Sequence, residues 1–465
     1  MKYDLVIIGG GPAGLALAQC AIKSNKKKIL IIERENDIGG CHRVRQIDGL
    51  MTEHGPRVYS SAYKVFQTLL NDMNLDFYNL FKEYNFSISH IGNETLLSIL
   101  TFKEKFHLFS SFIFYMINSN YGKNITMLNY MKNYNFTFKS YDVIDRLCRL
   151  TDGASSDNYD LYKFLQLINQ QFLYKLYQPI QPNNIGLFTK WKSYLIENNV
   201  DILLNSTVDK INIVNNKVIS VNQNNEEIFG DVFVLATPPA SFIDLLNDQT
   251  INTFTDNFKE FVEKTNYNNY ISIIFHWDIK LQLNLVYGFP KSDWGLAFIV
   301  LSDYMKFDTS KTVISTAITI PNYKSITLNK SANQCTKDEI IKEAFNQLKQ
   351  SFPNLPDPTH AKISSGDYYK DDQWNTIDKA FISTNLYLPF KSKTILNLYN
   401  LGTQNGKHIY QFTSLESAVT NAVYLSHILY PELKNKFKIS YGYTIRFIFI
   451  SFIILILVLF LILLI

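Results

Sequence analysis

Cysteine is scarce in this sequence, which holds four among its 465 residues. None of them forms a Cys-x-x-Cys pair, so the sequence predicts neither a zinc site nor a disulfide framework, and a reducing compartment is expected. The net charge is also small, because 45 basic and 41 acidic side chains leave a formal net charge of only +4. There is no long basic run, and a surface that binds nucleic acid is therefore not indicated.

Apolar residues, by contrast, make up 46% of the chain, and aromatic residues alone make up 14%. This composition excludes a collagenous, coiled-coil or intrinsically disordered chain. At roughly 100–200 residues per domain, the length allows about two to four domains, or one large α/β body with a second lobe. We therefore expect a mostly folded protein with a large core.

The last residues form one long apolar run, in which no charged side chain follows Arg446. As a helix, residues 445–465 would span roughly 30 Å, the thickness of the hydrocarbon core of a bilayer. A helix that is apolar on every face is expected in lipid rather than in a protein core. The sequence thus predicts a transmembrane tail anchor at residues 445–465, preceded by a basic linker at residues 433–444.

The charges around this run predict its orientation. The linker carries Lys434, Lys436 and Lys438, and basic residues beside a span mark its cytosolic side, so the catalytic domain should face the cytosol. The amino terminus leads directly into a strand and a glycine turn, without the basic region and cleavage site of a signal peptide. Because no basic residue follows the span, we expect an endoplasmic reticulum-type membrane rather than the mitochondrial outer membrane.

The amino-terminal residues carry a nucleotide-binding motif. Residues 3–8 form an apolar run typical of a buried strand, and a helical pattern follows from residue 15. Between them lies a Gly-x-Gly-x-x-Gly turn, whose residues of interest are Gly9, Gly11, Pro12, Ala13 and Gly14. Gly11 would let a pyrophosphate approach the backbone, and the N-terminus of the helix would offer it free N–H groups.

A second expected strand, at residues 28–32, ends in Glu33. This carboxylate follows Gly14 by 19 residues, a spacing at which it can accept hydrogen bonds from both hydroxyls of an adenosine ribose. A glutamate here favours an unphosphorylated ribose over that of NADP. The motif by itself leaves open whether the dinucleotide is FAD or NAD.

Further glycines and arginines follow the second strand. Glu33 is followed by a Gly-Gly doublet at residues 39–40, by Arg43, and by the pattern Glu-x-Gly-Pro-Arg at residues 53–57. This order resembles the FAD-binding head of the flavin amine oxidase and protoporphyrinogen oxidase superfamily, and the last two features look more like its protoporphyrinogen oxidase branch. The resemblance assigns these residues to the cofactor: Arg34, Gly39, Gly40, Arg43, Gly55, Pro56 and Arg57.

Two later segments extend the resemblance. The strands expected between residues 200 and 239 are similar to the family's middle FAD segment, where the position of Val208 touches the adenine through its backbone. Residues 398–402 and 413–419 are similar to its closing segment, a strand and a glycine followed by a helix whose N-terminus faces the flavin. There the resemblance assigns to the cofactor Gly402, Thr403, Leu415 and Glu416.

The expected fold class is α/β, with a Rossmann-like FAD-binding domain, an α+β substrate-binding lobe and a C-terminal transmembrane helix. The FAD-binding domain is assembled from three segments, 1–70, 186–250 and 395–432, and the lobe from residues 71–185 and 251–394. The apolar run at residues 106–117 is too short to cross a membrane, and we expect it to line the lobe or to touch the bilayer.

The resemblance implies oxidation of a C–N or C–C bond in a mostly apolar small molecule, by two-electron transfer to FAD. No cysteine follows Cys335 to attach the flavin, so the FAD should be noncovalent. The lysine that amine oxidases place near flavin N5 is expected near residues 271–273, where this chain has Ser272. Because a flavin accepts the hydride itself, little acid–base apparatus is needed, and His54 and His276 are the remaining candidates for catalysis.

Two other functions stay open. The head is also similar to that of UDP-galactopyranose mutase, a non-redox flavoenzyme with the same strand, glycine turn and doublet. The third reading is a degenerate flavoprotein that serves as a membrane-tethered binding module. Bleaching of the flavin by a substrate would distinguish the oxidoreductase from both.

Overall fold

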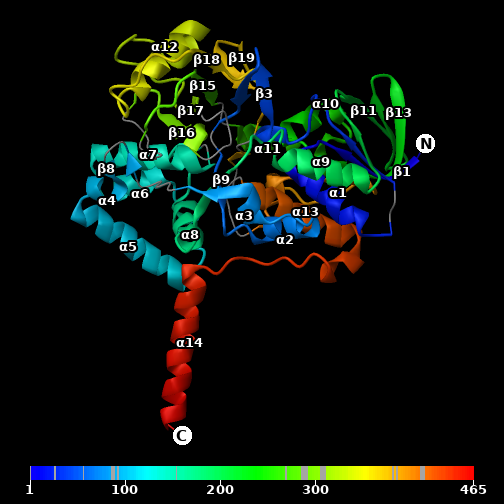
Figure 1. The fold of residues 1–465 in the computed structure, drawn as a ribbon. Coiled ribbons are helices and arrows are strands. Elements are labelled where there is room, and N and C mark those ends of the chain that lie inside the picture. The colour runs from blue at the N-terminus through cyan, green and yellow to red at the C-terminus, as the bar shows by residue number, and fades with distance from the viewer. Residues whose placement is uncertain are drawn as a thin grey trace.

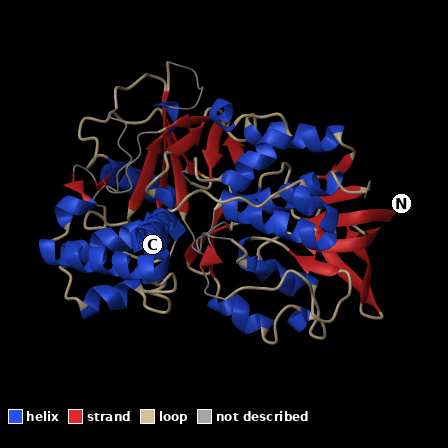
Figure 2. Ribbon diagram, turned by 90° about the horizontal axis from the view of Figure 1, so that it is seen from below, coloured by secondary structure: helices blue, strands red, loops and turns tan. Residues whose placement is uncertain are grey.

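The structure is a computed structural model with two lobes side by side and one long helix, α14 (Ile445–Leu464), projecting below them (Figure 1). It describes residues 2–25, 28–55, 57–84, 90–91, 94–152, 154–267, 270–283, 292–303, 310–379, 382–383, 386–408 and 414–464. Seen from below, the C-terminal end lies under one lobe and the N-terminus at the far edge of the other (Figure 2).

A seven-stranded sheet forms the centre of the nucleotide-side lobe. Strand β1 (Lys2–Ile8) pairs in parallel with β2 (Ile29–Ile32) and with β13 (Glu226–Leu235). The other strands are β10 (Val200–Leu203), β12 (Lys217–Gln223), β11 (Val208–Val214) and β22 (Leu398–Asn400). Leu5 and Ile7 face one core and Val6 and Ile8 the other, as a strand covered on both faces requires. The predicted α/β fold with a Rossmann-like domain is confirmed.

Helices cover both faces of this sheet. On one face the helices are α1 (Pro12–Ile22), α2 (Lys64–Asp72), α9 (Leu187–Glu197) and α13 (Leu415–Leu429). On the other face lie α10 (Phe242–Leu245) and α11 (Phe258–Lys264). Phe258 and Phe261 fall in the range 251–394 predicted for the substrate lobe, yet they share an apolar core with Val6 and Ile8. The middle nucleotide-side segment therefore extends beyond residue 250, because its apolar side chains cover this face of the sheet.

The second lobe joins a sheet to a group of helices. Its four-stranded antiparallel sheet has the order β16 (Leu296–Val300), β17 (Thr312–Ile318), β15 (Ile271–Trp277) and β18 (His360–Ile363), with α12 (Lys337–Leu348) packed against it. The helices below are α4 (Leu96–Ile99), α5 (Phe102–Ile117), α6 (Met127–Asn133), α7 (Phe138–Asp152) and α8 (Leu161–Gln171). The apolar run predicted at residues 106–117 is part of α5.

Short strands form further small sheets. They are β3 (Val44–Ile47) with β4 (Leu50–Glu53), β5 (Tyr59–Ser60) with β9 (Leu176–Pro179) and β6 (Phe81–Glu83), and β19 (Asp367–Lys370) with β20 (Gln373–Thr376). The remaining short elements are α3 (Phe77–Leu80), β7 (His90–Ile91), β8 (Glu94–Thr95), β14 (Asn266–Tyr267) and β21 (Ile382–Ser383).

Helix α14 has a mean hydropathy of 3.2 over its residues Ile445–Leu463, and none of that window is buried. Its first turn is fixed to the second lobe, because the backbone N–H of Arg446 donates to Asn169 Oδ1 at 2.7 Å and its Nε donates to the carbonyl oxygen of Met116 at 2.9 Å. By length and composition the helix could cross a membrane.

Candidate functional site

A cavity of about 720 Å³ opens between the sheet of the nucleotide-side lobe and the second lobe. The predicted cofactor residues that line it are Gly9, Gly11, Pro12, Ala13, Glu33, Arg34, Gly40, Arg43, Arg57, Val208, Gly402, Thr403 and Leu415. The structure thus brings together residues from all three predicted segments. Gly14, Gly39, Gly55 and Glu416 do not line the cavity, and Pro56 lies outside the described residues.

The three glycines of the turn serve different purposes. Gly9 has a φ of +116°, and a Cβ on Gly14 would lie 2.1 Å from the carbonyl oxygen of Gly9, so the fold itself requires both. Gly11 has ordinary extended dihedral angles, φ −78° and ψ 176°, and a Cβ there would have Gly40 Cα, at 3.8 Å, as its nearest neighbour. Its missing side chain therefore leaves open space at the N-terminus of α1, where a pyrophosphate would bind.

Glu33 follows β2 at the cavity wall and is held in one orientation. Its Oε2 accepts from the backbone N–H of Gly10 at 2.8 Å, and its Oε1 accepts from that of Glu35 at 3.0 Å. The guanidinium of Arg43 lies 3.3 Å from Oε1. A carboxylate fixed in this way beside the glycine turn is preorganised to accept from ribose hydroxyls.

The closing segment reaches the cavity through the start of α13. Ser414 caps this helix by accepting from the backbone N–H of Ser417 at 3.0 Å, and both Ser414 and Leu415 line the cavity. Sequence reasoning missed Gln404, which lines the same wall. Its buried Nε2 has no hydrogen-bond partner within the described chain, so this donor is available to a bound group.

Glu416, in contrast, points away from the cavity. Its two carboxylate oxygens accept from the backbone N–H groups of Val65 and Phe66, both at 2.9 Å, and so cap the N-terminus of α2. Burial raises the pKa of this carboxyl to about 8. These hydrogen bonds give Glu416 a structural role at the start of α2, where the resemblance assigned it to the cofactor.

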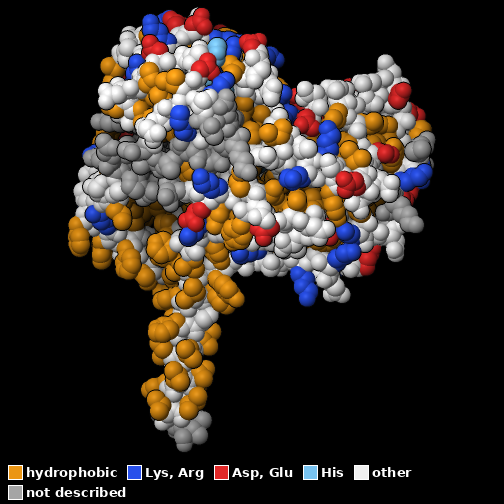
Figure 3. Space-filling model, in the orientation of Figure 1, with side chains coloured by type: hydrophobic (Ala, Val, Ile, Leu, Met, Phe, Trp, Pro, Cys, Tyr) orange, Lys and Arg blue, Asp and Glu red, His pale blue; other side chains and the backbone are white. Residues whose placement is uncertain are grey.

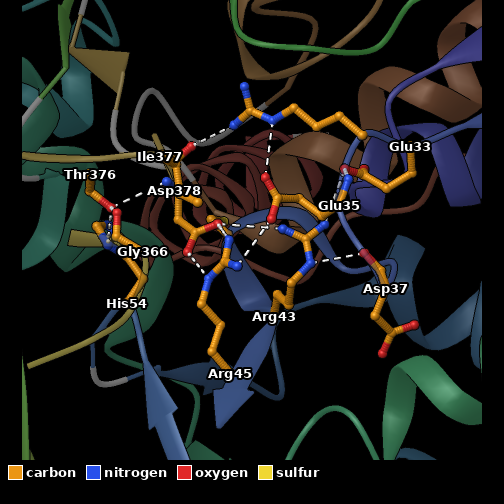
Figure 4. A network of polar contacts seen from close by, with 12 residues as sticks. Glu33, Glu35, Asp37, Arg43, Arg45, His54, Gly366, Thr376, Ile377 and Asp378 are labelled. Carbon is orange, nitrogen blue, oxygen red and sulfur yellow. Dashed lines mark hydrogen bonds and ion pairs between the residues drawn. The ribbon is translucent and has the colours of Figure 1, made fainter. Parts of the chain in front are cut away.

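A network of ion pairs beside the cavity joins the two lobes (Figure 4). Arg45 donates to both carboxylate oxygens of Asp378, at 3.0 and 3.1 Å, and to Glu35 at 3.0 Å. Arg43 lies 3.5 Å from the same aspartate and donates to the carbonyl oxygen of Asp37 at 2.8 Å. Asp378 also lines the cavity, so the loop after Glu33 and the segment after β20 are held together over the nucleotide site.

The Glu-x-Gly-Pro-Arg segment passes beside the cavity. Glu53 is buried, and this burial raises its pKa to about 7 although Arg57 acts in the opposite direction. The guanidinium of Arg57 donates to the carbonyl oxygen of Cys41. Ser272, where the amine oxidase lysine was expected, donates to the carbonyl oxygen of His54 and so lies against this segment.

Neither of the two candidate histidines lines the cavity. Burial lowers the pKa of His54 to about 3, and His276 Nε2 donates to the carbonyl oxygen of Met51 at 3.2 Å. The described histidine on the cavity wall is His42, which sequence reasoning missed. Burial, with Arg57 nearby, holds the pKa of its imidazole well below the usual range, so this ring is neutral at neutral pH.

The cavity continues into the second lobe. Its lining there includes Thr151, Leu167, Gln171 and Tyr368, so the nucleotide end and an end in the second lobe belong to one chamber. The sequence offered no signal for these residues, because their spacing is that of ordinary helix and strand faces.

Comparisons with known proteins agree with this geometry. Residues 7–73 match the family model of an NAD(P)-binding Rossmann-like domain. No curated protein matches the sequence. Among solved structures, a putrescine oxidase with bound putrescine is similar over 92% of this chain and 99% of its own, at 12% identity and a TM-score of 0.67.

Two further structures share the fold. Cyclohexylamine oxidase from Brevibacterium oxydans IH-35A is similar over 93% of this chain and 100% of its own, at 11% identity and a TM-score of 0.63. A protein assigned as a protoporphyrinogen oxidase from Exiguobacterium sp. 255-15 is similar over 92% and 99%, at 15% identity and a TM-score of 0.60. The chain therefore has the fold of these oxidases, and its residues 7–73 match a dinucleotide-binding domain.

Proposed function

We propose that this protein is an FAD-dependent oxidoreductase that oxidises a C–N or C–C bond of a mostly apolar small molecule, with the FAD bound noncovalently. The observation that supports this most is the single chamber that runs from Gly11 and Glu33 to Leu167 in the second lobe. A dinucleotide on the glycine turn would have its far end in the same chamber as a substrate.

The chain's own residues would bind the cofactor, orient the substrate and exclude water. Gly11 and the N-terminus of α1 would hold the pyrophosphate, Glu33 the adenosine ribose, and Gln404 with the start of α13 the flavin end. When bound, the flavin supplies the acceptor for two electrons from the substrate. The lowered pKa of His42 makes its imidazole a weak base, and we propose that no side chain acts as an indispensable base.

The test is anaerobic reduction of the flavin. The purified protein should be yellow, acid precipitation should release FAD, and candidate amines, porphyrinogens and sterol-like lipids are then screened for bleaching. With a reducing substrate found, His42→Ala at the cavity wall, and His54→Ala and His276→Ala away from it, should each change the reduction rate by less than the 10²–10⁴-fold typical of one general acid or base. Loss of all reduction with FAD still bound would contradict the absence of a base. Binding of a sugar nucleotide without bleaching would favour the mutase-like function.

We also propose that α14 anchors the protein in a membrane, with the two lobes on the cytosolic side and an endoplasmic reticulum-type membrane as the site. An exposed helix with a mean hydropathy of 3.2 has little to stabilise it in water. Three exposed lysines precede it, Lys434, Lys436 and Lys438, as the cytosolic flank of a span requires.

A further inference from the structure

Helix α5 has an apolar face that no described part of the chain covers. Its exposed side chains include Phe102, Phe106, Phe109, Ile113 and Ile117, at spacings of three and four residues that align them along one side of the helix. Phe102 is 85% exposed, Phe109 63% and Ile117 68%. A helix in water normally turns such a stripe to the core, so this orientation is the reverse of the usual one.

This face is continuous with the base of α14. Arg446, in the first turn of α14, donates to the carbonyl oxygen of Met116 near the end of α5. Phe172 and Leu173, just after α8, are also exposed, and α8 meets α14 through Asn169. Figure 3 shows apolar side chains extending from the lower edge of the second lobe onto α14.

Charge on α5 agrees with an apolar environment for this face. Its only acidic residue, Glu104, is buried and accepts from the backbone N–H of Thr101 at 2.6 Å and from Ser140 Oγ at 2.9 Å. Lys103, at the N-terminal end, is exposed. Phenylalanines on one face with lysine beside them are the composition of helices that lie in the interface of a membrane.

We infer that the exposed face of α5 is a second membrane-contacting surface, which rests in the headgroup and acyl-chain boundary of the bilayer that α14 crosses. This inference rests on the proposed anchor for its geometry, since a bilayer around α14 would meet the lower edge of the second lobe. In Figure 1, α5 runs obliquely down to the top of α14. Ile113 and Ile117 should therefore lie deeper in the lipid than Phe102.

The experiment uses the full chain in phosphatidylcholine–phosphatidylserine vesicles, with and without brominated acyl chains. The native tryptophans Trp191, Trp277, Trp294 and Trp374 are buried and provide a constant background. Phe109→Trp and Ile113→Trp report on α5, and Phe452→Trp reports on α14. The control is Phe229→Trp, an exposed site that pairs with Lys2 at the far end of the other lobe.

Brominated lipid should quench the added emission at residues 109 and 113 to an extent comparable with that at residue 452, while the emission at residue 229 is unchanged. If only residue 452 is quenched, α14 is anchored but the body stands away from the lipid, and the inference is overturned. If residue 452 is not quenched, the proposed anchor fails, and the inference, which places α5 in the bilayer that α14 crosses, is overturned with it.

Discussion

The fold does not require glycine at residue 11. Its extended backbone suits any residue, and the space beside it is open. We expect Gly11→Val to fold normally but to purify without flavin, because the new side chain would occupy the place of the pyrophosphate. Flavin absorbance and circular dichroism measure the two properties.

Gly14→Ala provides the contrast to this prediction. A Cβ at residue 14 would lie 2.1 Å from a backbone oxygen, so this variant should be destabilised whether or not FAD is present. A Gly11→Val protein that retains stoichiometric flavin would remove the main support for the proposed cofactor position.

The surroundings of Asp367 predict how the stability of the protein depends on pH. Asp367 accepts from the backbone N–H of Ser272 at 2.8 Å, and burial raises its pKa from 3.8 to about 8. Between these pH values the folded chain holds a proton that the unfolded chain has lost, so a rise in pH favours unfolding. The contribution of this one group to the free energy of unfolding should fall by at most about 1.4 kcal/mol per pH unit.

Asp367→Asn keeps an oxygen that can accept from the backbone N–H of Ser272. Its amide group does not titrate. Urea unfolding between pH 5 and about 8 should therefore show a flatter pH dependence for this variant than for the native chain. Asp248→Asn, at a side chain that is 99% exposed, serves as the control and should leave the slope unchanged. Identical slopes for all three proteins would mean that Asp367 is already ionised in the folded state.

The pair Arg45–Asp378 joins elements from the two lobes beside the cavity. Their side chains are 13% and 3% exposed. Removal of one partner therefore leaves the charge of the other largely buried, with few groups of opposite charge to pair with. We expect Arg45→Met or Asp378→Asn alone to lower the free energy of unfolding by roughly 3 kcal/mol and to weaken FAD retention. The double variant should lose less free energy of unfolding than the two single variants lose together, because the partners interact directly.

The matched control for this pair is Lys2–Asp231, whose side chains are 60% and 40% exposed. Asp231→Asn should change the free energy of unfolding by less than about 1 kcal/mol and leave the flavin content as it is. Additive effects of the two single changes at Arg45 and Asp378 would show that the lobes are held together by other contacts.

At the scale of the whole molecule, α14 should determine where the protein is found. The full chain should resist alkaline extraction from membranes, whereas a variant that lacks residues 445–465 should be released, because the apolar surface that favours lipid is gone. Protease added outside sealed vesicles should digest both lobes, with a lumenal protein as the control for sealing. Protection of the lobes would reverse the proposed orientation, and release of the full chain would contradict the anchor.

Much of the nucleotide-side lobe could be predicted from the sequence, because its signals are local. The buried strand before Gly9, the turn itself and the acid at Glu33 lie within a short stretch of chain, and hydrophobic periodicity with turn chemistry predicts all three. The apolar helix at residues 445–465 is equally local. Thirteen of the cofactor residues assigned from motif and resemblance line one cavity, since motif residues project from elements that their own spacing defines.

Only the tertiary structure decided which buried polar groups meet. Glu416 caps a helix 350 residues earlier in the chain, Asp378 pairs with Arg45 across 333 residues, and His42 rather than His54 reaches the cavity wall. It also decided that the apolar stripe of α5 faces outward. Periodicity determines that a face is apolar, but whether that face meets a core or remains exposed depends on how distant elements pack.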